Sequence, residues 1–228
     1  MKKILISLAA LLIYIMPANA VTKSLGITGI SSTIDSTVTD DIDSNGSIDT
    51  TKDISNDISY GSIFFEVTNE DIGPGSMTFG IDYIPGSAEF DSRSTSQASC
   101  KAKAAGACSQ TTGTNKGSVD VDNHITFYIQ PGVTTSNGLT VFGTLGYVTA
   151  DAEADVQSVS STNKKETKSL DGIKLGLGVK KVLGNSMFVK LEYAQTDYDD
   201  ISVTTGNNTK VTADIDNTTL GLSIGKSF

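Results

Sequence analysis

The sequence has no tryptophan, one arginine and one histidine, and these shortages exclude several classes of protein. With 26 acidic residues against 17 basic ones, the chain carries a net charge of −9, so it lacks the basic surface that nucleic-acid binding requires. Beyond residue 20, no segment approaches the roughly 18 consecutive apolar residues of a membrane-spanning helix. Proline is sparse, whereas glycine, threonine, serine, isoleucine and valine are abundant. This composition favours strands and turns.

Residues 1–20 predict a secretory signal peptide. Two lysines precede an apolar run, and Ala18-Asn19-Ala20 forms an A-x-A cleavage site. The apolar run, residues 4–16, is too short for a membrane anchor, since a spanning helix needs about 20 residues. The signal contains two basic residues and no acidic one, so cleavage leaves residues 21–228 as one domain with a net charge of −11.

The two cysteines, Cys100 and Cys108, are predicted to form a disulfide, because a signal peptide directs the chain to an oxidising compartment. They lie in the small-residue stretch CKAKAAGAC between polar runs, which predicts the tip of a loop that the disulfide holds together. No histidine is near, and the spacing is not C-x-x-C, so a metal site or a redox-active pair is disfavoured.

Apolar and polar residues alternate in eight segments after residue 21, a pattern typical of strands with one apolar face. In the sixth segment, for example, Ile173 and Leu175 alternate with Lys174 and Gly176. The predicted strands are 22–34, 57–69, 76–90, 119–133, 139–150, 170–182, 187–200 and 215–228.

The connections between these strands alternate strictly between long and short. The long ones are about 36–56, 91–118, 151–169 and 201–214. A membrane barrel has this alternation, because its turns are short on the periplasmic side and its loops are long outside. The sequence therefore predicts an all-β fold: an eight-stranded antiparallel up-and-down transmembrane β-barrel with short periplasmic turns and long extracellular loops.

The polar face of these strands is predicted to point into the barrel, because each charge would cost about 2–4 kcal/mol at the midplane of the lipid. An eight-stranded barrel is just wide enough for its own side chains to fill it. We therefore expect an ion-pair network that plugs the lumen, formed by Glu66, Asp82, Lys174, Lys190 and Glu192. Separately solvated charges in a wet lumen are the first alternative. A soluble sandwich with the apolar face as its core is the second.

The last ten residues, TLGLSIGKSF, place Leu220, Leu222, Ile224 and Phe228 on the apolar face. Together with the signal peptide and seven other strands, this end resembles the small eight-stranded outer-membrane barrels of the outer membrane protein A-like and opacity-protein-like group. The resemblance implies that the outer-membrane assembly machinery recognises this strand as the barrel closes. Lys226 departs from the group's pattern, in which an aromatic residue is more usual.

The first long connection contains a partial calcium-loop pattern. From Asp41 it reads D-x-D-x-N-G-x-I-D, which sets Asp41, Asp43, Asn45 and Asp49 at side-chain ligand positions and the Ser47 carbonyl between them. The bidentate acid of the pattern is missing, because Lys52 occupies that position and Asp53 comes one residue later. A weak calcium site and a merely acidic, solvated loop both remain open, and no other cofactor is expected.

His124 is the only histidine in the chain, so any catalytic serine–histidine pair would depend on it. Lipid A deacylases that resemble this chain in size carry a histidine and a serine two residues apart on the lipid-facing surface. Here the sequence is HITFY, with Thr126 in place of the serine and an inward face, so the chain is predicted not to be an enzyme.

The sequence thus predicts a monomeric barrel in the outer membrane of Gram-negative type, exported through the periplasm and surrounded by outer-membrane lipid and lipopolysaccharide. Its loops would have a structural or surface-interaction role, with an extracellular ligand or a host surface as partner. The competing prediction is a narrow porin-like channel for small solutes.

Overall fold

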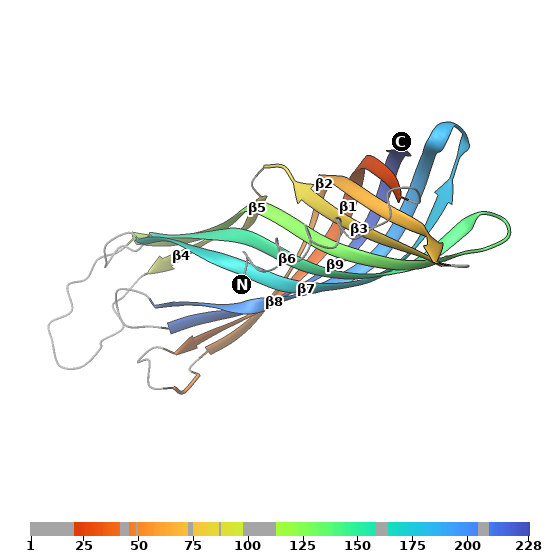
Figure 1. Cartoon of the computed structure of the whole chain (residues 1–228). Coiled ribbons are helices and arrows are strands. Elements are labelled where there is room, and N and C mark those ends of the chain that lie inside the picture. The colour runs from red at the N-terminus through yellow and green to blue at the C-terminus, as the bar shows by residue number, and fades with distance from the viewer. Residues whose placement is uncertain are drawn as a thin grey trace, which may run out of the picture.

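The computed structural model describes residues 21–41, 46–48, 50–72, 75–86, 88–97, 113–157, 164–204 and 210–228. Nine strands form one antiparallel sheet (Figure 1). They are β1 (Val21–Asp41), β2 (Thr50–Ile72), β3 (Gly75–Ile84), β4 (Ala88–Gln97), β5 (Gly113–Thr134), β6 (Leu139–Gln157), β7 (Lys164–Val182), β8 (Met187–Thr204) and β9 (Lys210–Ser227). A 3-10 turn, η1 (Gly184–Ser186), joins β7 to β8. None of the described residues form a helix long and apolar enough to cross a bilayer.

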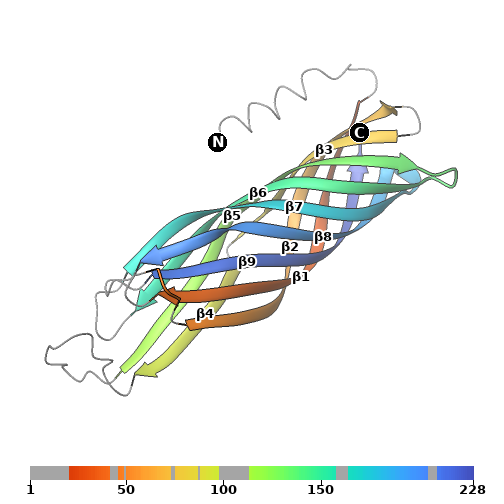
Figure 2. The same ribbon diagram turned by 90° about the horizontal axis from the view of Figure 1, so that it is seen from below.

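The sheet closes on itself through a pairing between β3 and β5. β4 also pairs with β5, further along the same strand, so β3 and β4 together make one interrupted barrel strand. The predicted eight-stranded closed antiparallel barrel is therefore confirmed. β1 pairs with both β2 and β9, and the last residue, Phe228, donates its backbone N–H to the Lys23 carbonyl (2.9 Å), so first and last strands meet (Figure 2).

The predicted strand bounds were too short at one end of the barrel. The turns β2–β3, β5–β6 and β7–β8 gather at one end in Figure 1, and the strands run on at the other end into the predicted loops. The following predicted loop residues are strand: 36–41, 50–56, 91–97, 113–118, 151–157, 164–169, 201–204 and 210–214. Their polar composition suggested loops, but cross-strand hydrogen bonds hold them: Thr37 donates to Asp53 (2.9 Å), and the hydroxyl groups of Ser202 and Thr212 bond to each other (2.9 Å). The predicted strand 76–90 is also wrong as a continuous element, because it breaks at Pro85, whose nitrogen has no hydrogen to donate.

The outer surface carries an apolar belt near the end with the short turns. Outward side chains there are strongly exposed, with Leu177 at 69% and Ile27 at 63%. A soluble protein rarely exposes a continuous apolar surface, whereas lipid requires one. The belt comprises Leu25, Ile27, Ile63, Phe65, Ile81, Tyr83, Val133, Val141, Leu145, Ile173, Leu175, Leu177, Leu191, Tyr193, Leu220, Leu222, Ile224 and Phe228.

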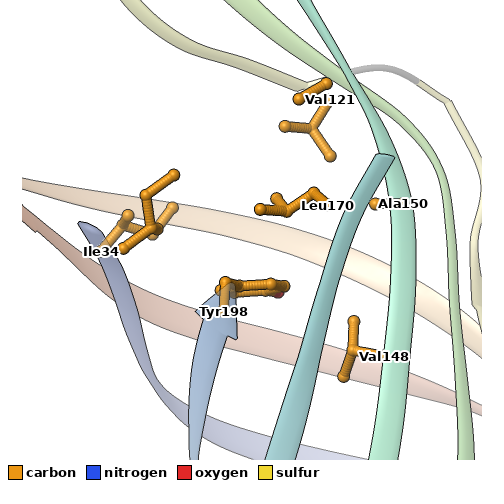
Figure 3. Packing of buried hydrophobic residues seen from close by; sticks show 8 residues of the cluster. Ile34, Val121, Val148, Ala150, Leu170 and Tyr198 are labelled. Atoms are coloured by element: carbon orange, nitrogen blue, oxygen red, sulfur yellow. The ribbon is translucent and has the colours of Figure 1, made fainter. Parts of the chain in front are cut away.

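Above this belt the polarity of the wall reverses. β9 shows the change: Leu220 and Leu222 face outward and are exposed, but higher up Ile215 is buried while Asp214 and Asp216 are exposed. The buried side chains above the belt form an apolar cluster inside the barrel, and Figure 3 shows Ile34, Leu170 and Tyr198 converging from different strands. Water surrounds this upper part, so its interior is packed like the core of a soluble protein. The cluster consists of Ile34, Val121, Val148, Ala150, Ala152, Leu170, Tyr198 and Ile215.

Inside the belt, four aromatic rings each lie over a glycine on the neighbouring strand. The four pairs are direct cross-strand partners: Phe64 with Gly26, Tyr128 with Gly80, Phe142 with Gly178 and Phe188 with Gly225. A side chain on any of these glycines would collide with the ring. The glycines therefore make room for large side chains in a narrow barrel, and each of the eight barrel strands contributes one residue to these pairs.

Candidate functional site: the barrel lumen and its outer extension

A buried ion pair crosses the lumen at the level of the apolar belt. Glu66 on β2 and Lys190 on β8 are in direct contact, and their side chains are 1% and 5% exposed. Tyr128 on β5 donates its hydroxyl to the same Glu66 oxygen (2.8 Å). The Lys190 ammonium also lies 4.3 Å from the centre of the Phe64 ring. Pairing and cation–π contact offset the cost of removing this lysine from water.

A second ion pair lies beside the first. Lys174 on β7 contacts Glu192 on β8, with 2.7 Å between Nζ and Oε1. The other Glu192 oxygen accepts hydrogen bonds from the Gln130 amide (3.0 Å) and the Thr144 hydroxyl (3.3 Å). Side chains from four strands are thus joined around one carboxylate.

The structure brings together four of the five residues of the predicted network, and Asp82 lies beside them. Asp82 accepts a hydrogen bond from Ser62 (2.7 Å), not from a lysine, among the contacts of the described residues. One lumenal cavity of only about 50 Å³ is lined by Asp82, Lys174, Lys190 and Glu192, together with Tyr128 and Gln130. We call Glu66, Lys190, Lys174 and Glu192, with Tyr128 and Gln130, the lumenal lattice.

His124 lies on the inner face of β5, where the sequence predicted it. Its Nε2 atom is 3.0 Å from the hydroxyl of Tyr198 on β8, and the two rings meet edge to face. Thr126, two residues on, is also buried inside the barrel. The pair therefore does not present a histidine and a hydroxyl to lipid.

Above the belt, the outer wall is acidic. Asp216 on β9 stands directly opposite both Asp35 on β1 and Asp197 on β8, so three carboxylates form a row across adjacent strands. Partial desolvation, and then the charges of Asp197, Asp214 and Asp35, raise the pKa of Asp216 above its usual value. Like charges directly opposite one another destabilise a sheet, so this row carries a cost in stability.

The calcium prediction is only partly covered by the structure. Asp41 ends β1, and its carboxylate accepts a hydrogen bond from the Gly46 backbone N–H (2.8 Å), with Gly46 at φ +86°. Asp43, Asn45 and Asp49 lie outside the described residues. Asp53, one residue after the position of the missing acid, lies on β2 and accepts a hydrogen bond from Thr37. Within the described ranges, no group of three or more His, Cys, Asp or Glu residues could hold a metal ion.

Two further predicted groups of residues have different outcomes. Cys100 and Cys108 lie outside the described residues. Leu220, Leu222 and Ile224 on β9, and Phe228 directly after it, face outward and are 49–72% exposed, which is the face that the C-terminal pattern predicted.

The sequence did not reveal the apolar cluster above the belt or the contact between His124 and Tyr198. A signal for the cluster exists in β9, where alternation continues but the apolar face changes sides between Ile215 and Leu220. The histidine contact carries no such signal, because it joins residues 74 positions apart through closure of the barrel.

A closed antiparallel barrel with an outward apolar belt and a charged interior defines an integral outer-membrane β-barrel protein. The chain belongs to the family described as outer membrane protein beta-barrel domain, which it matches over residues 5–228. This membership places it in the Gram-negative outer membrane. No curated protein shows significant sequence similarity to the chain.

Solved structures share this architecture at low sequence identity. The outer membrane protease OmpT of Escherichia coli is 8% identical, with a TM-score of 0.51 over 92% of this chain and 97% of OmpT. The attachment invasion locus protein Ail of Yersinia pestis, crystallised with the heparin analogue sucrose octasulfate, is 13% identical, with a TM-score of 0.40 over 89% and 99%. Neisserial surface protein A is 9% identical, with a TM-score of 0.36 over 89% and 97%. At these identities the likeness concerns the fold alone.

Proposed function

We propose that this protein is a non-enzymatic surface-interaction protein whose barrel holds its extracellular loops away from the membrane. The observation that carries the proposal is the length of the strands beyond the belt. β9 continues for ten residues from Leu220 to Lys210, a rise of about 25 Å for a tilted strand. The apolar cluster packs this extension internally, so it is a rigid mount for the loops.

The exposed aspartates of the extension favour a partner with a positively charged surface, because complementary charge accelerates association. The chain's own acidity disfavours an anionic polysaccharide as partner. Loop replacement tests this role. A variant in which residues 98–112 and 158–163 are replaced by short Gly-Ser turns is displayed on a laboratory Gram-negative strain beside the parent chain. Binding to cultured epithelial cells, and to a basic and an acidic matrix protein, is then compared.

We expect the parent chain to bind cells and the basic protein, and the loop-replaced variant to lose both. Equal binding by the two chains would refute the surface-interaction role. Heat-modifiable migration on a gel provides the folding control, since a folded barrel migrates differently before and after boiling.

Within the same proposal, the lumenal lattice closes the barrel to solutes. Buried, paired charges and a residual cavity of about 50 Å³ support this closure. The competing function is a narrow channel, which is favoured by the polar side chains along the lumen, such as Ser24, Thr28 and Ser223. Planar-bilayer recordings distinguish the two: a closed lumen gives no steady conductance, whereas large, steady single-channel steps would support the channel.

A further inference from the structure

A second cavity lies inside the barrel next to the apolar cluster, at the upper edge of the belt. Its volume is about 80 Å³. Its wall is largely apolar, and the side chains come from six strands of the barrel. The apolar part consists of Ile34, Ile58, Ile84, Pro85 and Val121.

The barrel wall beside this cavity lacks part of its hydrogen-bond ladder. The pairing of β2 with β3 ends at Ile63 and Tyr83, and β3 itself ends at Ile84. β4 begins at Ala88 and pairs with β5, but among the described strands no pairing joins β4 to the upper half of β2. The exposed residues Pro85 and Gly86 lie at this interruption and also line the cavity. The cavity therefore reaches the wall at a gap between β2 and β4.

Beyond β4, its neighbour β5 is irregular at the same height. Its register shifts between Asp122 and Ile125, and Asn123 has a positive φ of 53°. This irregularity includes His124, which opposes Ile84 across the ladder and lines the cavity.

His124 offers the cavity one unused hydrogen-bonding atom. Its Nε2 atom is engaged with the Tyr198 hydroxyl (3.0 Å). Its Nδ1 atom is buried and has no hydrogen-bond partner among the residues that the structure describes. A buried ring nitrogen of this kind is costly unless a ligand or a water molecule supplies the missing bond.

We propose that this cavity binds a short linear alkyl alcohol, which enters through the gap between β2 and β4 and bonds its hydroxyl group to His124 Nδ1. The size of the cavity limits the alkyl chain to about two carbon atoms, because 80 Å³ is about half the volume of a cavity that holds benzene. The exposed carboxylates of Asp35 and Asp57 on the outer surfaces of β1 and β2 disfavour an anionic head group. A hydroxyl group suits the ring nitrogen in either tautomer, since it both donates and accepts.

The single histidine makes the test direct. The chain is labelled with ¹⁵N-histidine, refolded into lipid nanodiscs and titrated with ethanol while the one imidazole spin system is followed by NMR. Parallel titrations use tert-butanol, which is uncharged but too large for the cavity, and acetate, which has the same number of carbon atoms as ethanol and a negative charge. Val121→Phe fills the cavity from inside, and Ile84→Phe fills it at the gap in case the first variant does not fold. Val141→Phe, on the lipid-facing surface, is the matched control.

We expect a saturable shift of the Nδ1 resonance with ethanol. The shift is expected to be at least threefold smaller with tert-butanol or acetate, to be absent in the folded cavity-filled variant and to persist in Val141→Phe. A shift that grows linearly without saturation, or that survives in the cavity-filled chains, would overturn the proposal. Nuclear Overhauser contacts from the Ile84 methyl groups to lipid chains in alcohol-free discs would also overturn it, because the cavity would then hold the acyl tail of a membrane lipid.

Discussion

Phe64 on β2 and Gly26 on β1 stand directly opposite each other inside the barrel, and the phenyl ring covers the glycine. A Cβ atom at position 26 would collide with this ring and would lie 2.5 Å from the backbone oxygen of Ile224 on β9. A rotated side chain cannot relieve the second clash, because it involves the main chain where β1 closes the barrel against β9.

Gly26→Ala is therefore expected to destabilise the barrel by roughly 1–3 kcal/mol through overpacking. Gly29→Ala is the matched control on the same strand, because nothing lies within 4 Å of a Cβ at that position. Urea unfolding in lipid vesicles, followed by the gel shift of the folded form, measures both. Equal midpoints for the two variants would show that the ring moves aside at little cost.

Lys190→Met is expected to lower the free energy of unfolding by roughly 3–5 kcal/mol, because it leaves the buried Glu66 carboxylate without its cation. The double variant Glu66→Gln/Lys190→Met is expected to recover much of that loss, since no charge is then left unpaired. The exposed pair of Lys165 and Glu153, 2.5 Å apart, serves as the control, and its removal should cost at most about 1 kcal/mol. A double-mutant cycle on urea unfolding measures the coupling energy between Glu66 and Lys190, and a coupling energy near zero would contradict a buried ion pair.

Asp216→Asn is expected to stabilise the extension by a few tenths of a kcal/mol at pH 7, because it removes one of three opposed carboxylates. The pKa of Asp216 is raised in the fold, so its favourable contribution is present below the ordinary carboxyl pKa of 3.8 and is lost as the pH rises through the raised value. The advantage of the variant should therefore vanish towards pH 3 and shrink in 1 M salt.

Asp53→Asn is the control for that series, since Asp53 accepts a hydrogen bond from Thr37 and should gain nothing from neutralisation. Thermal unfolding across the pH range compares the three chains. An advantage of Asp216→Asn that is independent of pH would exclude charge repulsion as its cause.

Calcium binding by the first connection remains a prediction of the sequence. Calorimetry of the refolded chain is expected to show weak, saturable heat that Asp43→Ala abolishes and Asp53→Ala leaves unchanged, because Asp53 belongs to β2. The absence of heat from the parent chain would identify the stretch as an acidic turn without a metal.

The predicted disulfide between Cys100 and Cys108 can be counted chemically. Thiol labelling of the denatured, unreduced chain should find no free thiol, and prior reduction should expose two. Two free thiols without reduction would contradict the prediction. The upper barrel is held by ladders and an apolar cluster that do not include these cysteines, so we expect reduction to leave the heat-modifiable fold intact.

The sequence alone determined the barrel, because a two-residue period is local information. Ile173, Leu175 and Leu177 alternate with Lys174, Gly176 and Gly178, and hydrocarbon on one side of the wall leaves only one orientation for such a strand. The number of strands followed from the alternating segments and the connections between them. The inward position of Glu66 and Lys190 followed from the two-residue period.

Only the tertiary structure decided where the strands end and which inward residues meet. Thr37 and Asp53 resemble loop residues until the neighbouring strand supplies their partner, and Ile215 becomes a core residue only because the barrel extends beyond the lipid. The pairing of Lys190 with Glu66, 124 positions away, depends on the relative register of strands that are distant in the chain. The interruption at Pro85 and the cavity behind it depend on closure as well, because a gap in a wall exists only once the wall is closed elsewhere.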